Sequence, residues 1–412
     1  MTPSLDIEFV RSQFPAFAEP SLQGQAFFDN AGGSYACTQV IDHLTHYYKE
    51  TKLQPYHLHP ASQKAGEQMD LSHKRLAEYL NVEAKDVHLG PSTSQNTYVL
   101  AQAFGDILNE GDEIVVTNQD HEANSGVWRR LSKKGVVVKE WPIDPLTGQL
   151  DVSQLDTLFT DKTKLLVFPH CSNVVAHINP VAEICRKAKL CGVRTVVDGV
   201  SYAGHELPNV GALDADIYLF SLYKVYGPHI GVMVIRPDCA EALGNQSHYF
   251  NGEYRHKWFV PAGPDHAQVA ASRGVVDYFD VLHDHHYPEA ADVQEKAKRV
   301  RSLIHFAEAP LLSRVLSFVD GHPQLSLLGS SNPQERTAVI SLVPKNQTPQ
   351  QLALALIKQG IICGTGHFYA VRLLEAMGVN TETGVLRLSF VHYTNEQEID
   401  QLLNALELCL SR

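Results

Sequence analysis

Residues 215–237 read ADIYLFSLYKVYGPHIGVMVIRP and place two apolar, β-branched runs on either side of a lysine and a Gly-Pro turn. Each run has the length and composition of a strand that is buried on both faces. Lys224 lies between the runs, although lysine is among the side chains least often found in a protein interior. This stretch therefore predicts two strands of a central sheet with a cationic side chain at a strand end.

Four further apolar runs precede this stretch, and connections long enough for helices separate them. Near-continuous apolar strands of this kind are typical of a parallel sheet that helices cover on both faces. We therefore predict an α/β fold whose large, mostly parallel sheet lies between roughly residues 25 and 275. The four runs are DEIVVTN (112–118), GVVVKEW (135–141), TKLLVFPH (163–170) and VRTVVDGV (193–200).

The pattern changes after this sheet. A long charged helical stretch is followed by the apolar run TAVISLV (337–343) and by two helix starts with capping-box spacing, at Thr348 and at Thr394. These features predict a second, smaller α/β domain. The expected parts are an N-terminal arm with a helix that packs on the small domain (1–24), a large domain (25–284) and a small C-terminal domain (285–412).

Composition narrows the class of ligand. The 412 residues contain 34 basic and 46 acidic side chains, a formal charge of -12, which disfavours general binding of nucleic acid or anionic membranes. The seven cysteines form no CxxC pair, so we expect neither a disulfide framework nor a metal site. The start of the chain resembles no secretory signal, and no apolar run approaches membrane-spanning length. We therefore predict a cytoplasmic protein that binds a small molecule.

Polar residues follow several of the predicted strands, where open α/β sheets place their ligands. Ser92 and Thr93 begin a helix after a strand, and the free N–H groups and hydroxyls of a helix start suit a phosphate. Asp198 ends a buried strand, where a carboxylate requires a cationic or hydrogen-bonding partner. The ordinary structural alternatives are helix caps for the hydroxyls and a turn residue for the aspartate.

Lys224 and His121 also follow strands. A lysine whose pKa is lowered by its surroundings forms a Schiff base with an aldehyde, and a histidine ring can lie against a planar cofactor. Taken singly, a lysine that reaches solvent and a surface histidine are the simpler interpretations. Taken together, the features describe a ligand with a phosphate, an aldehyde, a basic ring nitrogen and an aromatic face. Pyridoxal 5'-phosphate has all four, and we predict it as the cofactor.

Six motifs, distributed over nearly the whole chain, resemble the class V aminotransferase-fold enzymes and, within them, the cysteine desulfurase-like proteins. The resemblance implies pyridoxal-phosphate fold-type I, which is aspartate aminotransferase-like, with a mostly parallel seven-stranded sheet in the large domain. It also implies a homodimer whose active sites lie near the subunit interface. The motifs are FFDNAGG (27–33), DHEANSGVW (120–128), SNVVAHINP (172–180), VDGVSYAGH (197–205), FSLYKVYGPHIGV (220–232) and LRLSFVHYTNEQEID (386–400).

The resemblance implies roles for individual residues. Lys224 matches the Schiff-base lysine, which is also the general base, and Asp198 matches the aspartate that pairs with the pyridine nitrogen. His121 matches the ring-stacking histidine, and Asn173 matches the residue that contacts the phenolic oxygen. Arg387 falls where the family binds the substrate's α-carboxylate, a group that suits a planar guanidinium. The same resemblance places Ser92, Thr93 and Ser221 at the phosphate, and Asn30 and His205 are, like Arg387, predicted to bind the substrate.

The chain also departs from the family pattern. Tyr223 replaces the histidine that precedes the lysine, and Ser201 replaces a glutamine that contacts the phenolic oxygen, so both are predicted cofactor contacts of altered chemistry. Where relatives place a Gly-Thr that reaches a neighbouring subunit's phosphate, this chain reads AGPDH (262–266), which leaves the sharing of that site open.

The largest departure concerns the cysteine of the desulfurases, which lies on a loop in a pattern like RTGHHCA. The matching stretch here is GTGHFYA (364–370), with Tyr369 at the cysteine position. A phenol does not accept sulfane sulfur as a thiolate does. Cys363 lies six residues earlier, and a structural cysteine is its expected role.

We predict a pyridoxal-phosphate enzyme that acts on an α-amino acid and is cysteine desulfurase-like, of the C–S lyase or sulfurtransferase type, without the loop cysteine. Two alternatives remain open. One is an aminotransferase, an epimerase or another lyase that uses Lys224 only, and the other is a protein that binds the cofactor without turnover. The predicted partners are an amino-acid substrate, a second copy of the chain and, for the desulfurase-like reaction, a sulfur-acceptor protein.

Overall fold

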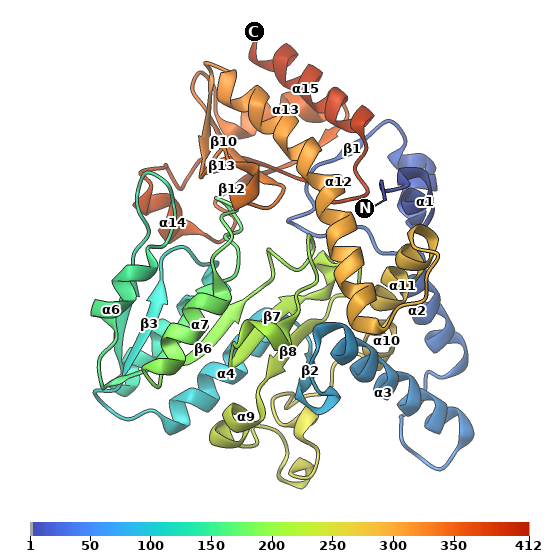
Figure 1. Cartoon of the computed structure of the whole chain (residues 1–412), viewed down its shortest axis with the longest axis vertical. Helices are drawn as coiled ribbons and strands as arrows, with labels where there is room; N and C mark the ends of the chain where they lie inside the picture. The colour runs from blue at the N-terminus through green and yellow to red at the C-terminus, as the bar shows by residue number, and fades with distance from the viewer. Residues whose placement is uncertain (1–2, 412) are drawn as a thin grey trace.

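The computed structural model describes residues 3–411, and its largest element is a sheet of seven strands (Figure 1). The spatial order is β2-β8-β7-β6-β5-β3-β4. β8 alone runs opposite to the other six strands of this sheet, so the predicted mostly parallel α/β sheet is confirmed. The strands are β2 (Val87–Gly90), β3 (Glu113–Thr117), β4 (Val137–Trp141), β5 (Thr163–Pro169), β6 (Arg194–Asp198), β7 (Ile217–Ser221) and β8 (Gly231–Ile235).

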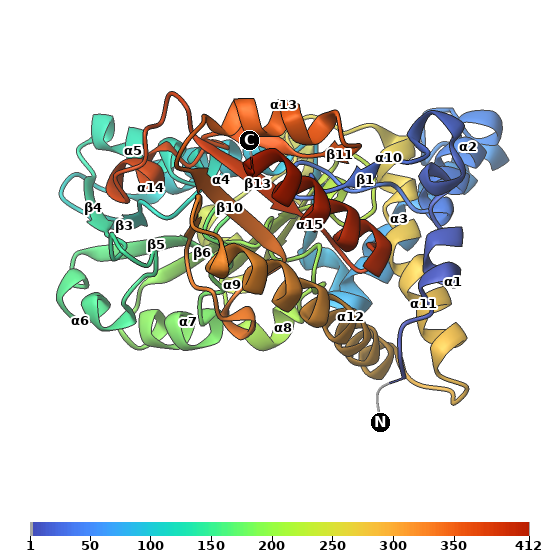
Figure 2. The same ribbon diagram turned by 90° about the horizontal axis from the view of Figure 1, so that it is seen from above.

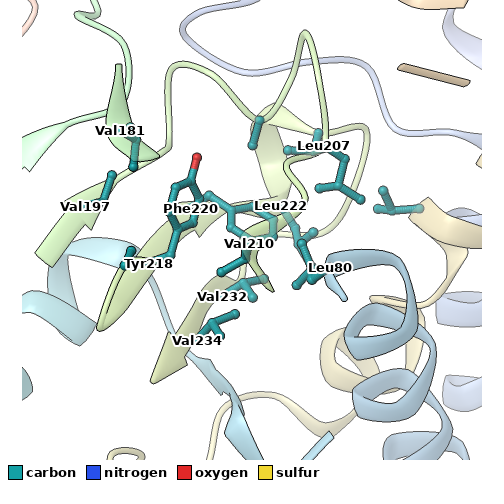
Figure 3. Packing of buried hydrophobic residues seen from close by; sticks show 14 of the residues in the cluster. Leu80, Val181, Val197, Leu207, Val210, Tyr218, Phe220, Leu222, Val232 and Val234 are labelled. Carbon is teal, nitrogen blue, oxygen red and sulfur yellow. The ribbon is translucent and has the colours of Figure 1, made fainter. Parts of the chain in front are cut away.

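Successive residues of β7 point into two different hydrophobic cores. Tyr218 and Phe220 pack in one core, whereas Ile217 and Leu219 pack in the other. Figure 3 shows the first of these faces, where Phe220 and Val232 lie among helical side chains such as Leu80. Burial on both faces explains why these strands are apolar throughout. One face is covered by α4 (Thr93–Ile107), α5 (Gly126–Arg129) and α9 (Pro237–Leu243); the other is covered by α3 (Pro60–Leu80), α7 (Val181–Leu190), α8 (Val210–Leu213) and α11 (Gly274–His286).

The small domain has an antiparallel sheet of four strands in the order β12-β13-β10-β9. Its own core is separate from the two cores of the large sheet and lies above them in Figure 1. The strands are β9 (Leu325–Leu328), β10 (Val339–Pro344), β12 (Gly364–Gly366) and β13 (Val385–Ser389), and the helices are α13 (Pro349–Ile357), α14 (Val371–Ala376), α15 (Glu396–Leu410) and the second half of α12 (Val293–Gly321).

One of the two predicted capping boxes is correct. Thr348 and Gln351 cap α13 reciprocally. The prediction for α15 was wrong by one residue, because Asn395 is the cap and pairs with Glu398. The amide of Asn395 accepts from the Glu398 N–H at 2.8 Å, so the helix begins one residue later than the Thr394 pattern indicated.

The N-terminal segment contacts both domains, as the view from above shows (Figure 2). In α1 (Ile7–Ser12), Arg11 pairs with Glu398 of α15 at 2.8 Å. Just before α1, Asp6 pairs with His285 at the end of α11 at 2.9 Å. The first strand, β1 (Ala26–Phe27), pairs in parallel with β11 (Ile361–Ile362). This part of the chain therefore packs in the core of the small domain, although it precedes the large domain in sequence.

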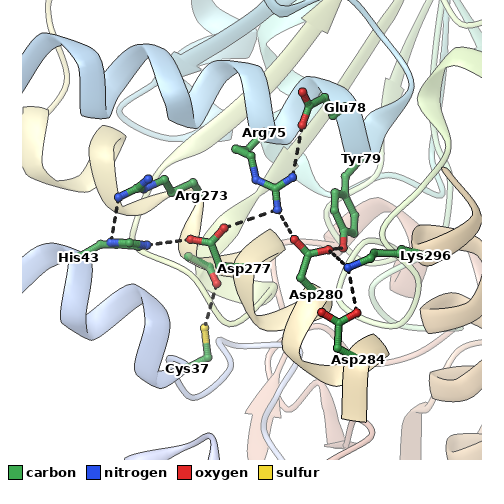
Figure 4. A network of polar contacts seen from close by, with 11 residues as sticks. Cys37, His43, Arg75, Glu78, Tyr79, Arg273, Asp277, Asp280, Asp284 and Lys296 are labelled. Atoms are coloured by element: carbon green, nitrogen blue, oxygen red, sulfur yellow. Dashed lines mark hydrogen bonds and ion pairs between the residues drawn. The ribbon is translucent and has the colours of Figure 1, made fainter. Parts of the chain in front are cut away.

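Acidic residues of α11 join the helices beside the large sheet (Figure 4). Asp277 accepts from His43 of α2 (Thr38–Glu50) at 2.8 Å, and Asp280 accepts from Tyr79 of α3 at 2.6 Å. Asp284 pairs with Lys296 of α12 at 2.8 Å. Because positions three and seven residues apart lie on one helical face, a single side of α11 holds α2, α3 and α12 together.

The remaining helices are α6 (Leu155–Leu158) and α10 (His266–Ala271).

Within residues 3–411, α12 alone has the length and hydropathy of a membrane-crossing helix. Its buried residues pack in two cores, with Val300 and Leu303 in that of the large domain and Val315 and Leu316 in that of the small domain. This packing is that of a core helix that connects two domains.

Candidate active site

A cavity of about 230 Å³ lies at the carboxyl ends of β3, β5, β6 and β7. It contains all nine residues that the sequence predicted around the cofactor, although these come from five separate stretches of the chain. A larger groove of about 630 Å³, beside α3 and α8, contains none of them. The nine residues are Ser92, Thr93, His121, Asn173, Asp198, Ser201, Ser221, Tyr223 and Lys224.

Lys224 reaches this cavity from a single 3-10 turn, Leu222–Lys224, that follows β7. Gly204 packs directly on this turn, because a Cβ at that glycine would lie 2.5 Å from the Lys224 carbonyl oxygen. Burial and the nearby Arg387 lower the pKa of the Lys224 amine to about 8, against the opposing charges of Asp198 and Asp29. The neutral, nucleophilic form of this amine is therefore far more populated at neutral pH than that of an ordinary lysine.

The lowered pKa predicts how Lys224 reacts in the cofactor-free protein. Labelling of Lys224 by trinitrobenzenesulfonate, followed by peptide mass analysis, is expected to rise with a midpoint near about pH 8. An unperturbed lysine would have its midpoint near about 10.4. Since Arg387 disfavours the charged amine, Arg387→Gln should raise the midpoint, and the exposed Lys189 serves as the internal reference. A midpoint at the ordinary value in the unmodified sequence would contradict this prediction.

Two carboxyl groups face the cavity from neighbouring regions of the sheet. Asp198, at the end of β6, accepts from the Val200 N–H at 2.8 Å, and burial raises its pKa. Asp120, which follows β3, accepts from the Asn124 amide at 2.8 Å, and burial together with Asp198 raises its pKa strongly. The second oxygen of Asp120 is buried without a hydrogen bond among the described residues. Buried acids of this kind require a cationic or proton-donating partner.

Sequence reasoning missed Asp120, although the signal was present in DHEANSGVW. The residue lies directly before His121 and follows a buried strand, which is the same position that singled out Asp198 in its own motif.

One end of the cavity is formed by the first turn of α4. The Ser92 hydroxyl accepts from the Gln95 N–H at 3.1 Å, and the Thr93 hydroxyl lies 2.7 Å from that of Ser221. The start of β8 approaches this turn so closely that a Cβ at Gly231 would lie 2.4 Å from the Ser92 carbonyl carbon. Ser92 is therefore a helix cap, and the same helix start presents the N–H groups and hydroxyls that an anion requires.

His121 offers a neutral, flat ring to the cavity. Its Nδ1 accepts from the Ala123 N–H at 3.1 Å, which assigns the proton to Nε2. Burial, Lys224 and Arg387 together lower the pKa of this imidazole to about 4.

Tyr223 also lines the cavity, and its ring stacks on that of His229 with centroids 4.9 Å apart.

Arg387 belongs to β13 of the small domain and is 4% exposed. Its Nη1 donates to the carbonyl oxygen of Asn173 at 3.3 Å, and its Nη2 lies 3.5 Å from an Asp29 oxygen. Burial lowers the pKa of Arg387 to about 10, and Asp29 opposes this shift. The guanidinium therefore remains charged and lies beside a residue of the cavity, at the junction of the two domains.

Two of the residues predicted to contact the substrate have side chains that are engaged elsewhere. Asn30 is buried with its amide donating to Ser389 O at 3.1 Å and accepting from the Tyr393 hydroxyl, so its side chain is used in joining the two domains. Its neighbour Asp29, at the start of a turn, reaches Arg387 instead. His205 pairs with Glu308 at 2.7 Å and lines a different cavity, of about 160 Å³.

Tyr369 lies at the edge of the site. Its ring centroid is 5.1 Å from that of His121, and its side chain is exposed. Cys363 lies between β11 and β12 and packs against the small-domain core, and burial raises the pKa of its thiol to about 12. Within residues 3–411, Cys171 is the only cysteine that lines the cavity, and burial raises its pKa to about 12 as well. Neither thiol is suited to act as a thiolate.

The sequence matches a family model and curated proteins over nearly its whole length. The model of the family "Aminotransferase class-V" matches residues 26–402. The chain is 32% identical to the aminotransferase-like protein FGM3 of Gibberella zeae over 99% of both chains. It is 29% identical to a cysteine desulfurase of Serratia proteamaculans over 98% of both chains.

Solved structures share the fold. A cysteine desulfurase from Thermococcus onnurineus superimposes with a TM-score of 0.85 at 24% identity over 99% of both chains. The cysteine desulfurase CsdA of Escherichia coli superimposes with a TM-score of 0.81 at 23% identity over 98% of both chains.

Proposed function

Because this chain belongs to the class-V aminotransferase family, we propose that it is a pyridoxal-5'-phosphate-dependent enzyme that acts on an α-amino acid. The observation that carries the proposal is the single cavity in which a lysine of lowered pKa lies with Asp198, His121 and the start of α4. The lysine would hold the cofactor's aldehyde covalently.

The residues of the cavity fit this cofactor. A protonated ring nitrogen would supply the cationic partner that the buried Asp198 requires, and the start of α4 would bind the phosphate. The Asn173 amide donates one N–H to Phe368 O at 2.8 Å and has a second N–H available for an oxygen on the ring. When bound, the cofactor withdraws electrons from the α-carbon of an attached amino acid.

The residues of the chain would then divide the remaining tasks. Lys224, with a pKa near about 8, can take and return a proton at the substrate's α-carbon. Arg387 would bind the α-carboxylate, and neutral His121 would cover one face of the ring without opposing the positive charge of the nitrogen. Asp198 would keep that nitrogen protonated.

The reaction we favour is that of a desulfurase-like lyase that releases its leaving group without a loop cysteine. The exposed phenol of Tyr369 and the buried thiol of Cys363 both favour release over persulfide formation. An aminotransferase or epimerase would need only the proton transfers of Lys224. The deciding experiment adds amino acids one at a time to the cofactor-loaded protein and identifies products by mass. With cysteine, release of sulfide together with pyruvate and ammonia supports the lyase, an oxoacid formed without release of sulfide supports the aminotransferase, and a spectrum that no amino acid changes supports binding without turnover.

Replacement of Cys363 tests whether a cysteine persulfide forms during the reaction. Cys363→Ser is expected to keep turnover within about twofold, because the thiol is protonated and packs in the small-domain core. The exposed Cys191 provides a matched control, Cys191→Ser. A loss of tenfold or more in Cys363→Ser alone, with the cofactor still bound, would indicate that the thiol takes part in the reaction.

We also propose that the enzyme is a homodimer. Exposed apolar side chains gather on two neighbouring segments, 48–58 and 249–254, and include Leu58, Tyr249 and Phe250. These segments meet where Gln54, Tyr56 and Asn251 line a common pocket. A surface of this kind is typical of a protein interface, and a second copy of the chain is the occupant that the family predicts. Sedimentation of the cofactor-loaded protein tests this proposal.

A further inference from the structure

Phe368 connects two site residues that come from different domains. The carbon of the Arg387 guanidinium lies 3.8 Å from the centroid of the Phe368 ring. The Phe368 carbonyl accepts from the Asn173 amide at 2.8 Å, and the Asn173 carbonyl accepts from Arg387 at 3.3 Å. The three residues therefore form a closed triangle in which each contacts both of the others.

The local backbone is arranged so that this ring can lie over the guanidinium. Gly364 of β12 is the direct partner of Arg387 in β13, and a Cβ at Gly364 would lie 3.1 Å from the Phe368 ring. Phe368 and Tyr369 have φ values of 47° and 58°, in the left-handed region that bulky residues rarely adopt. Such conformations persist where surrounding contacts hold them, and they concentrate at ligand sites. A glycine opposite Arg387 and a tight turn after β12 thus place the ring.

The remaining contacts of Arg387 leave one part of the guanidinium available. Asn173 and Asp29 occupy the two Nη atoms, and the ring covers one face. Nε is buried and has no partner among the described residues. A guanidinium with a free N–H at a fixed orientation is suited to a planar carboxylate.

We propose that Phe368 is a positioning residue for the substrate's carboxylate, because its ring fixes the orientation of Arg387. This inference rests on the proposed function, in which Arg387 binds that carboxylate. The contact between the cation and the ring holds the guanidinium in one plane, and the Phe368 carbonyl holds Asn173 at the same time. One residue thereby links the orientation of the substrate site to that of the cofactor site.

Two variants test the role of the ring. Phe368→Leu keeps an apolar side chain and removes the aromatic face, whereas Phe368→His keeps a flat ring that is neutral at about pH 8. The cofactor-loaded proteins are titrated with glycine, and with glycine methyl ester, which lacks the carboxylate, while the visible absorbance is recorded. Phe368→Leu is expected to weaken glycine binding about tenfold and to leave binding of the ester unchanged. Phe368→His should stay within about threefold of the unmodified protein for both ligands.

A second measurement does not depend on amino-acid binding. The rate at which phenylglyoxal modifies Arg387 is followed by peptide mass analysis, and it should rise several-fold in Phe368→Leu because the ring no longer covers the guanidinium. Unchanged labelling together with unchanged glycine binding would overturn the inference, as would an equal loss for glycine and its ester. If the unmodified protein does not respond to glycine, the labelling rate alone decides. Failure of the protein to bind pyridoxal phosphate would refute the proposed function, while the labelling rate would still report on Phe368.

Discussion

Replacement of Lys224 with alanine is expected to abolish covalent attachment of pyridoxal phosphate and to lower turnover by roughly three orders of magnitude or more. The variant removes both the amine that holds the aldehyde and the group that moves the proton at the α-carbon. Borohydride reduction followed by peptide mapping provides the measurement. The unmodified protein should give a pyridoxyl group on the peptide that contains Lys224, and the variant should give none.

Two further variants separate loss of the nucleophile from loss of charge and from general damage. Lys224→Arg keeps a positive charge that cannot be removed at neutral pH, so it should be as inactive as the alanine variant. Lys189→Ala alters an exposed lysine outside the cavity and should keep the labelling pattern of the unmodified protein. A pyridoxyl group on another lysine of the unmodified protein would refute the assignment.

Asp198→Asn is expected to lower turnover roughly 100-fold or more and to weaken retention of the cofactor during dialysis. Asparagine has nearly the shape of aspartate but carries no charge, so a protonated ring nitrogen would lose its buried partner. The absorbance of bound cofactor and the turnover rate are measured on the same preparations. Turnover close to that of the unmodified protein would show that Asp198 does not act on the ring nitrogen.

Asp120→Asn tests whether the two carboxyl groups have different roles. Burial and the charge of Asp198 raise the pKa of Asp120 strongly, which favours the protonated form of this group more than in an ordinary aspartate. An amide resembles a protonated carboxyl group, and Asp120→Asn is therefore expected to lose less than tenfold. Equal losses in the two variants would indicate that the pair acts as one unit.

The large sheet could be predicted from the sequence because its strands are buried on both faces. Residues such as Ile217 and Tyr218 are both apolar although they point in opposite directions, and this composition distinguishes the strand from its surroundings. The first residue of α15 could not be predicted from the sequence, because Thr394 and Asn395 both satisfy a capping pattern one residue apart. The choice between them depends on the backbone hydrogen bonds of the preceding turn.

Ser92, Thr93, His121, Asp198 and Lys224 could be predicted because each follows a strand of the same sheet, and the carboxyl ends of parallel strands meet at one edge. The other cofactor contacts were predicted from the resemblance to the family. Asn30 and His205, which the resemblance assigned to the substrate, have side chains that are engaged elsewhere. Both lie in motifs of the family, but the direction of each side chain depends on the extended segment or turn that carries it. Their neighbours in the same kinds of motif include Asp29 in FFDNAGG, which pairs with Arg387, and Asp120 in DHEANSGVW, which lines the cavity.

By itself, the sequence determined the class of fold, the lysine and aspartate at neighbouring strand ends, and the absence of a cysteine at position 369, because each of these depends on local composition and spacing. Only the tertiary structure decided that Phe368 lies over Arg387, that Asp29 pairs with this arginine and that the Cys363 thiol is buried. The pairing of Asp29 with Arg387 joins segments that are far apart in the chain. The position of Phe368 depends on a left-handed turn and on a glycine in the strand beside Arg387, and the burial of Cys363 depends on the small-domain core, so each is fixed only when the strands and helices of that domain pack together.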